Sequence, residues 1–342
     1  MKNIFFTIAF LIFALASQAT IYHVDKNQNR PSGYYGDLVT AINLASAGDT
    51  IYLYPASSDY GNITITKKVH LFGFGFDGTA GFGSRIYNLY LDTTTSPSSN
   101  PSGSTFQGIT FDNIISNKSN INNIGVYGCY ISSSYIKIAS GSSGWVIKNN
   151  LIKYYIQVNY CSNILIANNI FMGSNSYSIY YSTSSTVVVS NNLFFNFSHF
   201  YYTNNISVNN NIFICSGTTN QSYMENNQFI NNLSWRSTAT PYPLPPVGNT
   251  GTGNKSNVDP LFETGLSSGT FDYTKDYHLQ SSSPGKNAGT DGTDIGPYGG
   301  TNPFIWGGAI TIPQITEMVI RNPVVNQGTN INVKVKAKKA DL

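Results

Sequence analysis

The feature that most constrains this chain is a twin-asparagine motif that recurs through its middle. The second asparagine falls at positions 150, 169, 192, 211 and 232, so the steps between copies are 19, 23, 19 and 21 residues. Self-similarity at such a period is the mark of a solenoid, in which each repeat packs only on its neighbours. The five copies are IKNNL at 147–151, IANNI at 166–170, VSNNL at 189–193, VNNNI at 208–212 and FINNL at 229–233.

A repeat of about 21 residues has room for three short strands and their turns, but not for a pair of helices. Asparagine tolerates the left-handed backbone conformation that a sharp corner between strands requires. Stacked coils lie about 4.8 Å apart, so asparagine side chains at equivalent corners can hydrogen-bond along a ladder. We therefore interpret the asparagine pairs as structural and predict an all-β protein built as a parallel β-helix.

The first 19 residues have the features of a secretory signal peptide. Lys2 supplies the positive charge, residues 4–15 form an apolar run, and Ser17-Gln18-Ala19 provides small residues for cleavage. A membrane anchor is the alternative, but the apolar run is shorter than the roughly 18 residues that a spanning helix needs. We predict a protein exported to the medium, the cell surface or the periplasm, with no membrane insertion after cleavage.

A short helix is predicted ahead of the repeats. Asp37 can cap its first turn, and residues 49–53 beyond it have the alternation of a strand. The open end of a solenoid exposes apolar core and unpaired strand edge, so we interpret this helix as an N-terminal cap. Its apolar face consists of Leu38, Ala41, Ile42 and Ala45.

The composition narrows the class of function. Only 10% of the residues are charged, and the net charge of +3 is too small and too scattered to indicate nucleic-acid binding. Three cysteines give an odd count, and we interpret Cys129, Cys161 and Cys215 as buried free thiols, with one disulfide as the alternative. We expect a monomer with no nucleic-acid partner.

A solvent-facing row of tyrosines is predicted on the strand that lies some ten residues before each asparagine pair. We align the strands that begin at Tyr135, Tyr155, Ser178 and His199. Tyr223 and Glu225 extend the row into the next coil, with their register left open. Alternation places these side chains inside: Ile136, Ile138, Ile156, Val158, Ile179, Tyr181, Phe200 and Tyr202. It places these outside: Tyr135, Lys137, Tyr155, Gln157, Tyr180, His199 and Tyr201.

Two interpretations of this row remain open. Tyrosine is a good strand residue, and the row can be ordinary surface. The alternative is a sugar-binding face, because flat rings stack on pyranose faces and flanking polar groups hydrogen-bond the hydroxyls. We predict an exported protein that binds extracellular polysaccharide. The predicted binding residues are Tyr135, Tyr155, Gln157, Tyr180, Tyr201 and Tyr223.

Signals for catalysis are fewer. Between Ser104 and Trp235 the only carboxylates are Asp112 and Glu225, which lie too far apart for the paired acids of a glycoside hydrolase. A uronate lyase needs instead a base and a group that neutralises the substrate carboxylate. A lyase or hydrolase is the first alternative function, and a structural or adhesive surface protein is the second. The candidate catalytic residues are Lys137, His199 and Glu225.

An acid-rich segment lies downstream of the repeats. One interpretation is a calcium ion held near His278 by carboxylates and carbonyls. The spacing matches no EF-hand or nonapeptide calcium repeat, so we favour turn and capping chemistry and predict no metal and no cofactor. The acids are Asp259, Glu263, Asp272, Asp276, Asp291 and Asp294.

Alternation also turns an apolar stripe outward on the strand just before each asparagine pair. The stripe consists of Val146, Leu165 and Val188. Such a stripe is unusual on the surface of a secreted monomer. We expect residues 310–342, or part of the N-terminal loops, to cover it.

The capping helix leads to an AGDTI strand at 47–51, and the turn Gly73-Phe74-Gly75 follows. After the repeats come the segments NVDPLF at 257–262, DYHL at 276–279, SSP at 282–284 and DIG at 294–296. The first group resembles the start and first-coil turn of secreted bacterial right-handed parallel β-helix repeat proteins of the pectate-lyase-like superfamily, and the second group resembles their closing region.

The resemblance implies a right-handed solenoid over residues 20–300, between the signal peptide at 1–19 and a small C-terminal β segment at 301–342. It also implies a bacterial host. Alginate and chondroitin lyases with this fold use a lysine and an arginine on the substrate face, with acidic calcium ligands nearby. Here Lys137 is the one matching base, and no arginine lies between Arg85 and Arg236. The resemblance therefore implies a fold and leaves the reaction open.

Overall fold

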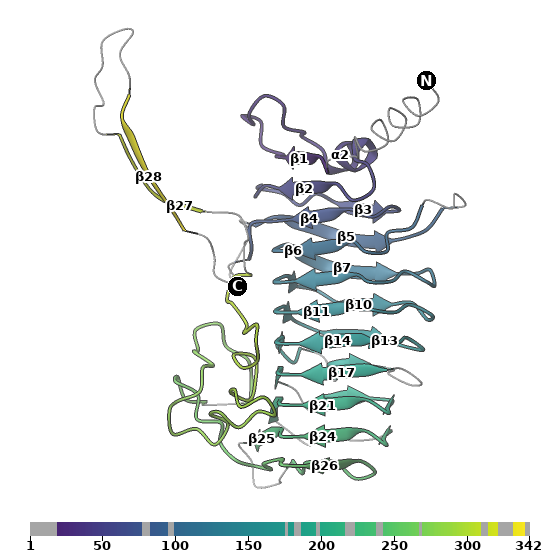
Figure 1. Cartoon of the computed structure of the whole chain (residues 1–342), viewed down its shortest axis with the longest axis vertical. Helices are drawn as coiled ribbons and strands as arrows, with labels where there is room; N and C mark the ends of the chain where they lie inside the picture. The colour runs from purple at the N-terminus through teal and green to yellow at the C-terminus, as the bar shows by residue number, and fades with distance from the viewer. Residues whose placement is uncertain are drawn as a thin grey trace, which may run out of the picture.

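The chain folds into an elongated parallel β-solenoid, whose strands stack like rungs along one axis (Figure 1). A short helix lies at the N-terminal end and an antiparallel strand pair near the C-terminus. The predicted fold class is confirmed. The structure, a computed structural model, describes residues 19–76, 83–94, 99–174, 177–180, 186–195, 199–215, 223–236, 242–266, 269–308, 314–320 and 331–338.

The first sheet runs along the whole solenoid and contains eleven parallel strands among the described residues. Each strand pairs with its equivalent in the next coil, as Ile147 does with Ile166. In spatial order the strands are β1 (Ile21–Val24), β2 (Thr50–Leu53), β4 (His70–Phe72), β6 (Thr105–Gln107), β8 (Gly125–Tyr127), β11 (Val146–Lys148), β14 (Ile164–Ala167), β17 (Val187–Ser190), β21 (Ser207–Asn209), β24 (Gln228–Ile230) and β26 (Thr250–Thr252).

The second sheet opens with β3 (Asn62–Ile65) and β5 (Arg85–Leu91) and divides in two at β7 (Thr110–Ser116). The branch that follows the asparagine pairs, here called the corner branch, contains β9 (Tyr130–Ile131), β12 (Leu151–Ile152), β15 (Ile170–Phe171), β18 (Leu193–Phe195), β22 (Ile212–Cys215) and β25 (Leu233–Arg236). The other, the tyrosine branch, contains β10 (Tyr135–Ile138), β13 (Tyr155–Val158), β16 (Ile179–Tyr180) and β19 (Phe200–Tyr201). A separate pair is formed by β20 (Thr203–Asn204) and β23 (Met224–Glu225).

Apolar side chains that alternate along the strands fill the interior. Ile136, Ile156 and Ile179 occupy equivalent positions in three coils of the tyrosine branch and are fully buried. In the corner branch the ring of Phe194 stacks on Phe171 at 4.6 Å and on Phe213 at 5.1 Å, measured between ring centroids. The interior therefore repeats the same contact in each coil, as a solenoid requires.

The N-terminal cap is α2 (Leu38–Leu44), as predicted. The Asp37 side chain accepts the backbone N–H of Thr40, which satisfies a donor that has no partner within the helix. Leu38, Ala41 and Ile42 are buried against the first coils. The helix thus closes the apolar interior at the end where β1 begins.

The first asparagine of each pair makes the corner between the first sheet and the corner branch. Its backbone is left-handed, with φ of 59° at Asn149, 52° at Asn168 and 53° at Asn191. Each of these residues lies just after a strand of one sheet and two residues before a strand of the other. Most residues avoid this conformation and asparagine tolerates it, so the predicted corner role is confirmed.

The second asparagine of each pair forms a buried ladder along the solenoid. Oδ1 of Asn169 accepts both the backbone N–H and the side-chain Nδ2–H of Asn150, each at 2.9 Å. Nδ2 of Asn169 donates to Oδ1 of Asn192 at 3.0 Å and to the carbonyl of Ile147 in the preceding coil at 2.9 Å. The amides are buried but paired, as buried polar groups must be. The ladder continues through Asn211, Asn232 and Asn254.

We expect Asn192→Ala to lower the free energy of unfolding by about 3 kcal/mol, because it leaves buried groups of Asn169 and Asn211 without partners. Urea denaturation measures the change. The control is Asn209→Ala, which alters a half-buried, outward-facing asparagine of β21 and should cost less than about 1 kcal/mol. Equal losses from the two variants would contradict the ladder's role.

Residues 257–308, here called the strap, run back along the outside of the corner branch (Figure 1). The strap covers a row of apolar side chains that the sheet register aligns coil by coil. The row consists of Leu151, Ile170, Leu193, Ile212 and Leu233, all fully buried. The strap side chains that pack on it include Phe262, Tyr277, Leu279, Ile295 and Phe304.

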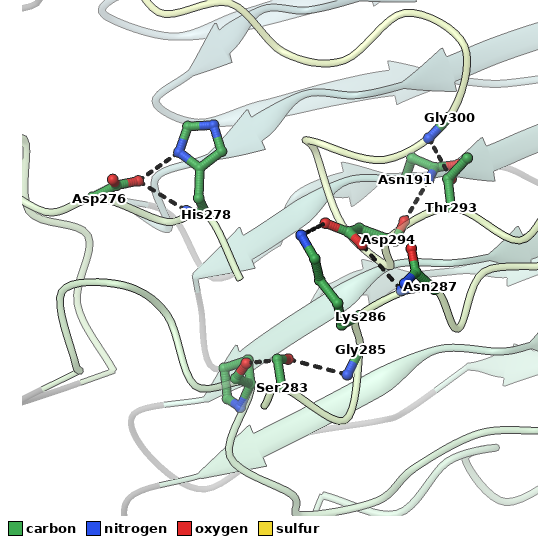
Figure 2. Close-up of polar contacts among 11 residues, drawn as sticks. Asn191, Asp276, His278, Ser283, Gly285, Lys286, Asn287, Thr293, Asp294 and Gly300 are labelled. Atoms are coloured by element: carbon green, nitrogen blue, oxygen red, sulfur yellow. Dashed lines mark hydrogen bonds and ion pairs between the residues drawn. The ribbon is translucent and has the colours of Figure 1, made fainter. Parts of the chain in front are cut away.

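The first asparagines hold the strap in place. Nδ2 of Asn168 donates to the carbonyls of Pro297 and Gly299 at 2.9 and 2.8 Å. Asn210 exchanges two hydrogen bonds with Thr290, one from each residue. In Figure 2, Asn191 reaches the main chain of Asp294 in the same way. The corner asparagines therefore link the solenoid to its cover.

The structure corrects the expected position of the apolar cover. The segment that packs on the solenoid is the strap, and its target is the corner-branch row, whereas Val188 of the predicted stripe stays 37% exposed. The stripe is short, since Val188 pairs with the polar Ser207 in the next coil. Farther along the chain, β27 (Gln314–Ile320) and β28 (Val333–Lys338) form an antiparallel pair with exposed apolar side chains such as Met318.

We expect a chain that ends at Gly308 to keep the melting temperature of the whole protein, because the described apolar side chains of β27 and β28 are exposed. A chain that ends at Ser256 should aggregate, because it uncovers the corner-branch row. Thermal melts and size-exclusion chromatography test both. Destabilisation of the longer chain would show that the hairpin supports the solenoid.

Two other sequence predictions can be placed. Cys129, Cys161 and Cys215 are free and buried, as the favoured interpretation has it. The predicted signal segment falls almost entirely outside the described residues, which begin at 19. Within the described part of the chain, no helix has the length and apolar character needed to cross a bilayer.

Candidate functional site

The tyrosine branch has the register that the sequence alignment predicts. Tyr135 lies beside Tyr155 in the next coil, Gln157 beside Tyr180, and Tyr180 beside Tyr201. The side chains that alternate with them, such as Ile156, point into the core. Outward residues of successive coils are therefore superposed along the axis of the solenoid.

Tyrosine rings form a continuous row across this surface. Tyr135 stacks on Tyr155 with ring centroids 5.3 Å apart, and Tyr155 lies 5.7 Å from Tyr180. The rings of Tyr180 and Tyr201 are nearly parallel, with centroids 5.4 Å apart and an interplanar angle of 9°. Tyr201 lies 5.9 Å from Tyr223, which is 57% exposed. The row thus spans every tyrosine that the sequence predicts for it.

Two further tyrosines join the row that sequence reasoning did not include. Tyr177, in the loop before β16, packs 4.1 Å from Tyr201. Tyr202 was predicted to point inside, but its backbone φ of 53° ends the strand. Its ring therefore stacks on Tyr223, with ring centroids 4.4 Å apart and an interplanar angle of 11°. Alternation holds only while the strand continues, and β19 has only two residues. The seven rings Tyr135, Tyr155, Tyr177, Tyr180, Tyr201, Tyr202 and Tyr223 are called the tyrosine row below.

The phenol group of Tyr155 is a neutral donor near neutral pH. Partial burial raises the pKa of Tyr155 above its ordinary value, and the neighbouring Tyr135 raises this pKa further. Half-buried rings that pack on one another lose little freedom when a ligand binds, since a tyrosine has only two side-chain torsions. The row is a pre-formed surface of ring faces and hydroxyls.

A column of amides continues the row toward the N-terminus. Nδ2 of Asn113 donates to Oδ1 of Asn88 at 2.7 Å, and Nδ2 of Asn88 donates to Oδ1 of Asn62 at 2.8 Å. Oδ1 of Asn113 in turn accepts the backbone N–H of Tyr135 at 3.2 Å. Sequence reasoning missed this column because the motif that aligns the later coils is absent from 62–113. The same face is therefore amide-lined in its early coils and aromatic in its later ones.

Two of the three candidate catalytic residues lie far apart on this face. Lys137 lies in β10 beside Gln157, and its Nζ donates to Oδ1 of Asn117 at 3.4 Å. Glu225 is exposed in β23, one coil beyond the end of the branch at Tyr201. Four coil steps of roughly 4.8 Å separate them by on the order of 19 Å. A base and an acid at that distance do not act on one bond.

His199 is not on the face, which corrects its predicted outward position. Its side chain is 1% exposed and packs among Phe194, Phe213 and Tyr242. Its Nε2 lies 3.3 Å from the Cys215 sulfur, and its buried Nδ1 has no hydrogen-bond partner among the residues that the structure describes. The prediction failed because His199 precedes β19, where the strand alternation has not yet begun.

Burial sets the ionisation of this interior pair. It lowers the pKa of His199 to about 3 and raises the pKa of the Cys215 thiol to about 12. Both groups are therefore neutral over the physiological range. An imidazole inside the solenoid does not reach a ligand on the tyrosine row, so His199 is a core residue.

We expect His199 to make the fold acid-sensitive. Below its ordinary pKa of 6.5 the unfolded chain binds a proton that the folded chain excludes, so stability is full above pH 6.5. It then falls by about 1.4 kcal/mol per pH unit as the pH drops toward 3. Urea titrations of the wild type and of His199→Gln at several pH values isolate this slope. Identical pH profiles would contradict it.

Asp112, one of the two repeat-region carboxylates, is engaged at the start of the branching. It is 5% exposed and binds the Arg85 guanidinium at 2.6 Å. It also accepts the hydroxyl of Ser132 at 3.0 Å. The Asp112 carboxylate therefore connects its own strand β7 to Arg85 of β5 and to Ser132, which follows β9.

Most of the acids of the strap accept N–H groups in turns, as the favoured interpretation predicts. Asp259 accepts the N–H of Leu261, and Asp272 and Asp291 do the same for residues two positions on. Asp276 Oδ1 lies 2.6 Å from Nδ1 of His278, and Asp294 binds Lys286 and Asn287. Figure 2 shows these contacts. No group of three or more His, Cys, Asp or Glu side chains suited to a metal occurs within the described part of the chain.

The His278 ring stacks on Tyr298 at 3.7 Å, on the surface of the strap. Ser283, nearby in sequence, is buried and donates its hydroxyl to the carbonyl of Pro260. It also accepts the N–H of Gly285 at 3.1 Å, as Figure 2 shows. The polar contacts of the strap are therefore those of a folded cover.

No protein-family model matches the chain, and a search of curated proteins finds no match. The solenoid and its tyrosine row are the features on which a functional proposal can rest.

Proposed function

We propose that this protein binds polysaccharide outside the cell through the tyrosine row. The observation that carries the proposal is the unbroken contact of the seven rings, from Tyr135 to Tyr223. The same proposal includes export by a signal peptide at residues 1–19 and membership of the pectate-lyase-like superfamily. They are supported by the sequence patterns that indicate them.

The chemistry of the row suits sugars. A pyranose has one face of C–H groups that packs on an aromatic ring, and a rim of hydroxyls that exchange hydrogen bonds. The tyrosine hydroxyls and the amide of Gln157 supply donors and acceptors beside the rings. A face that repeats in each coil also suits a ligand that repeats.

Binding without turnover is better supported than the lyase or hydrolase alternatives. Those alternatives depend on Lys137 and Glu225, which lie at opposite ends of the row, and on His199, which is buried. A structural or adhesive role remains the other alternative. It is distinguished by the absence of saturable binding to any glycan.

We expect the double variant Tyr180→Ala/Tyr201→Ala to lose polysaccharide binding by about tenfold or more, because each ring contributes on the order of 1 kcal/mol. Retardation in native gels that contain dissolved polysaccharides measures the affinity. The melting temperature should change little, since both rings lie on the surface of the solenoid.

Two controls accompany this experiment. Tyr87→Ala removes a 46% exposed ring from β5 outside the row and should leave retardation unchanged. Tyr180→Phe keeps the stacking face and removes only the hydroxyl, so it should retain most of the binding. Undiminished retardation of the double variant would sink the proposal.

A further inference from the structure

We propose that the tyrosine row takes an uncharged polysaccharide whose chain lies along the solenoid axis. This inference rests on the proposed function and adds two properties to it, the direction of the bound chain and its charge. We infer the direction of the bound polysaccharide from the geometry of the rings, and its lack of charge from the side chains beside the rings.

The rings define a track along the axis. Tyr135, Tyr155 and Tyr180 come from three successive coils, and Tyr201 from the fourth. The steps between their centroids are 5.3, 5.7 and 5.4 Å, close to the roughly 4.8 Å spacing of stacked strands. One pyranose is about as long as one such step. An extended chain along the axis therefore meets one new ring with each added sugar.

A polysaccharide that lay parallel to a strand would not meet a new ring with each added sugar. Within β13, the outward neighbour of Tyr155 is Gln157, and the ring contacts of Tyr155 lead to other coils. The rings form two axial columns, because Tyr180 and Tyr201 are in register with Gln157 and not with Tyr155, so the track takes one sideways step between Tyr155 and Tyr180. The amide column of Asn62, Asn88 and Asn113 prolongs the axial direction beyond Tyr135.

The aromatic part of the row is built from neutral side chains. Residues 154–224 contain no Asp, Glu, Lys or Arg, so histidine is the one residue type in this stretch that can carry a positive charge. The one histidine in this stretch, His199, is buried and neutral near pH 7. Hydroxyls and amides can replace the water around a neutral sugar by direct hydrogen bonds.

An anionic chain meets the opposite conditions. The face of an aromatic ring carries negative electrostatic potential, so carboxylates and sulfates are repelled where sugar rings are attracted. A polyuronate would bring a charge to almost every coil, and each would lose water against a phenol ring. Lys137 lies in the first coil of the row and Glu225 in its last, the coil of Tyr223, so these two charges offer one attraction and one repulsion.

The experiment compares neutral and anionic chains on the same protein. Retardation in native gels is measured with a β-glucan and a glucomannan as neutral chains, and with polygalacturonate and alginate as anionic chains, at low and high salt. We expect retardation by at least one neutral chain, with affinity changed less than about twofold by salt, and none by the anionic chains. Preference for an anionic chain, lost at high salt, would overturn the inference and leave the proposed function standing.

A gain-of-function variant tests the charge argument directly. Gln157→Lys adds a cation in the middle of the track and should create salt-sensitive retardation by polygalacturonate, whereas Gln157→Glu should not. No gain in the lysine variant, at an unchanged melting temperature, would contradict the view that the charge of the row selects the ligand.

Oligosaccharides of increasing length test the direction. Affinity measured by calorimetry should rise with each sugar from two to about five, because each added sugar reaches the ring of another coil. A plateau at two sugars would overturn the axial direction. If a natively folded protein retains no glycan at all, the proposed function itself fails and this inference falls with it.

Discussion

The constraint on which the structure depends is the alignment of coils by the buried asparagine ladder. Oδ1 of each ladder asparagine accepts two hydrogen bonds from the coil before it, as Asn169 does from Asn150. A shift of one residue would leave these buried amides unpaired, at a cost of several kcal/mol per coil. The ladder thereby sets the register of both sheets at their common corner. The superposition of Tyr135 on Tyr155, and of Tyr180 on Tyr201, follows from that register.

The twin-asparagine motif also determines which surface is covered and which is left open. The first asparagine turns the corner and directs its amide outward, where Asn168 and Asn210 hold the strap. The strap then buries the wholly apolar row that begins at Leu151. The outward residues of the tyrosine branch are aromatic and polar, so they tolerate water without a cover. One motif thus separates a sealed face from an accessible one.

Sequence reasoning was accurate where the signal is local and repeated. The period located the corners, the Asp37 cap placed the helix, and the alignment of four strands paired Tyr135 with Tyr155 as observed. It was wrong for His199 and Tyr202, which flank the two-residue strand β19. Alternation predicts the direction of a side chain only within a strand, so it says little about the residues that flank a strand of two residues. The strap escaped prediction because its contacts join residues far apart in the chain, as Asn168 and Gly299 do.

The same regularity limits the chemistry that this face supports. Catalysis concentrates unlike groups at one point, whereas a solenoid repeats similar groups along a line. Lys137 and Glu225 illustrate this, since the coils that carry them are held apart by the stacking that aligns the rings. A linear array of weak, similar contacts instead gains affinity by addition along a ligand that is itself linear and repetitive. Because the rings are packed before the ligand arrives, little of that gain is lost in ordering the protein. The regular spacing of Tyr135, Tyr155 and Tyr180 is therefore what the fold contributes to binding.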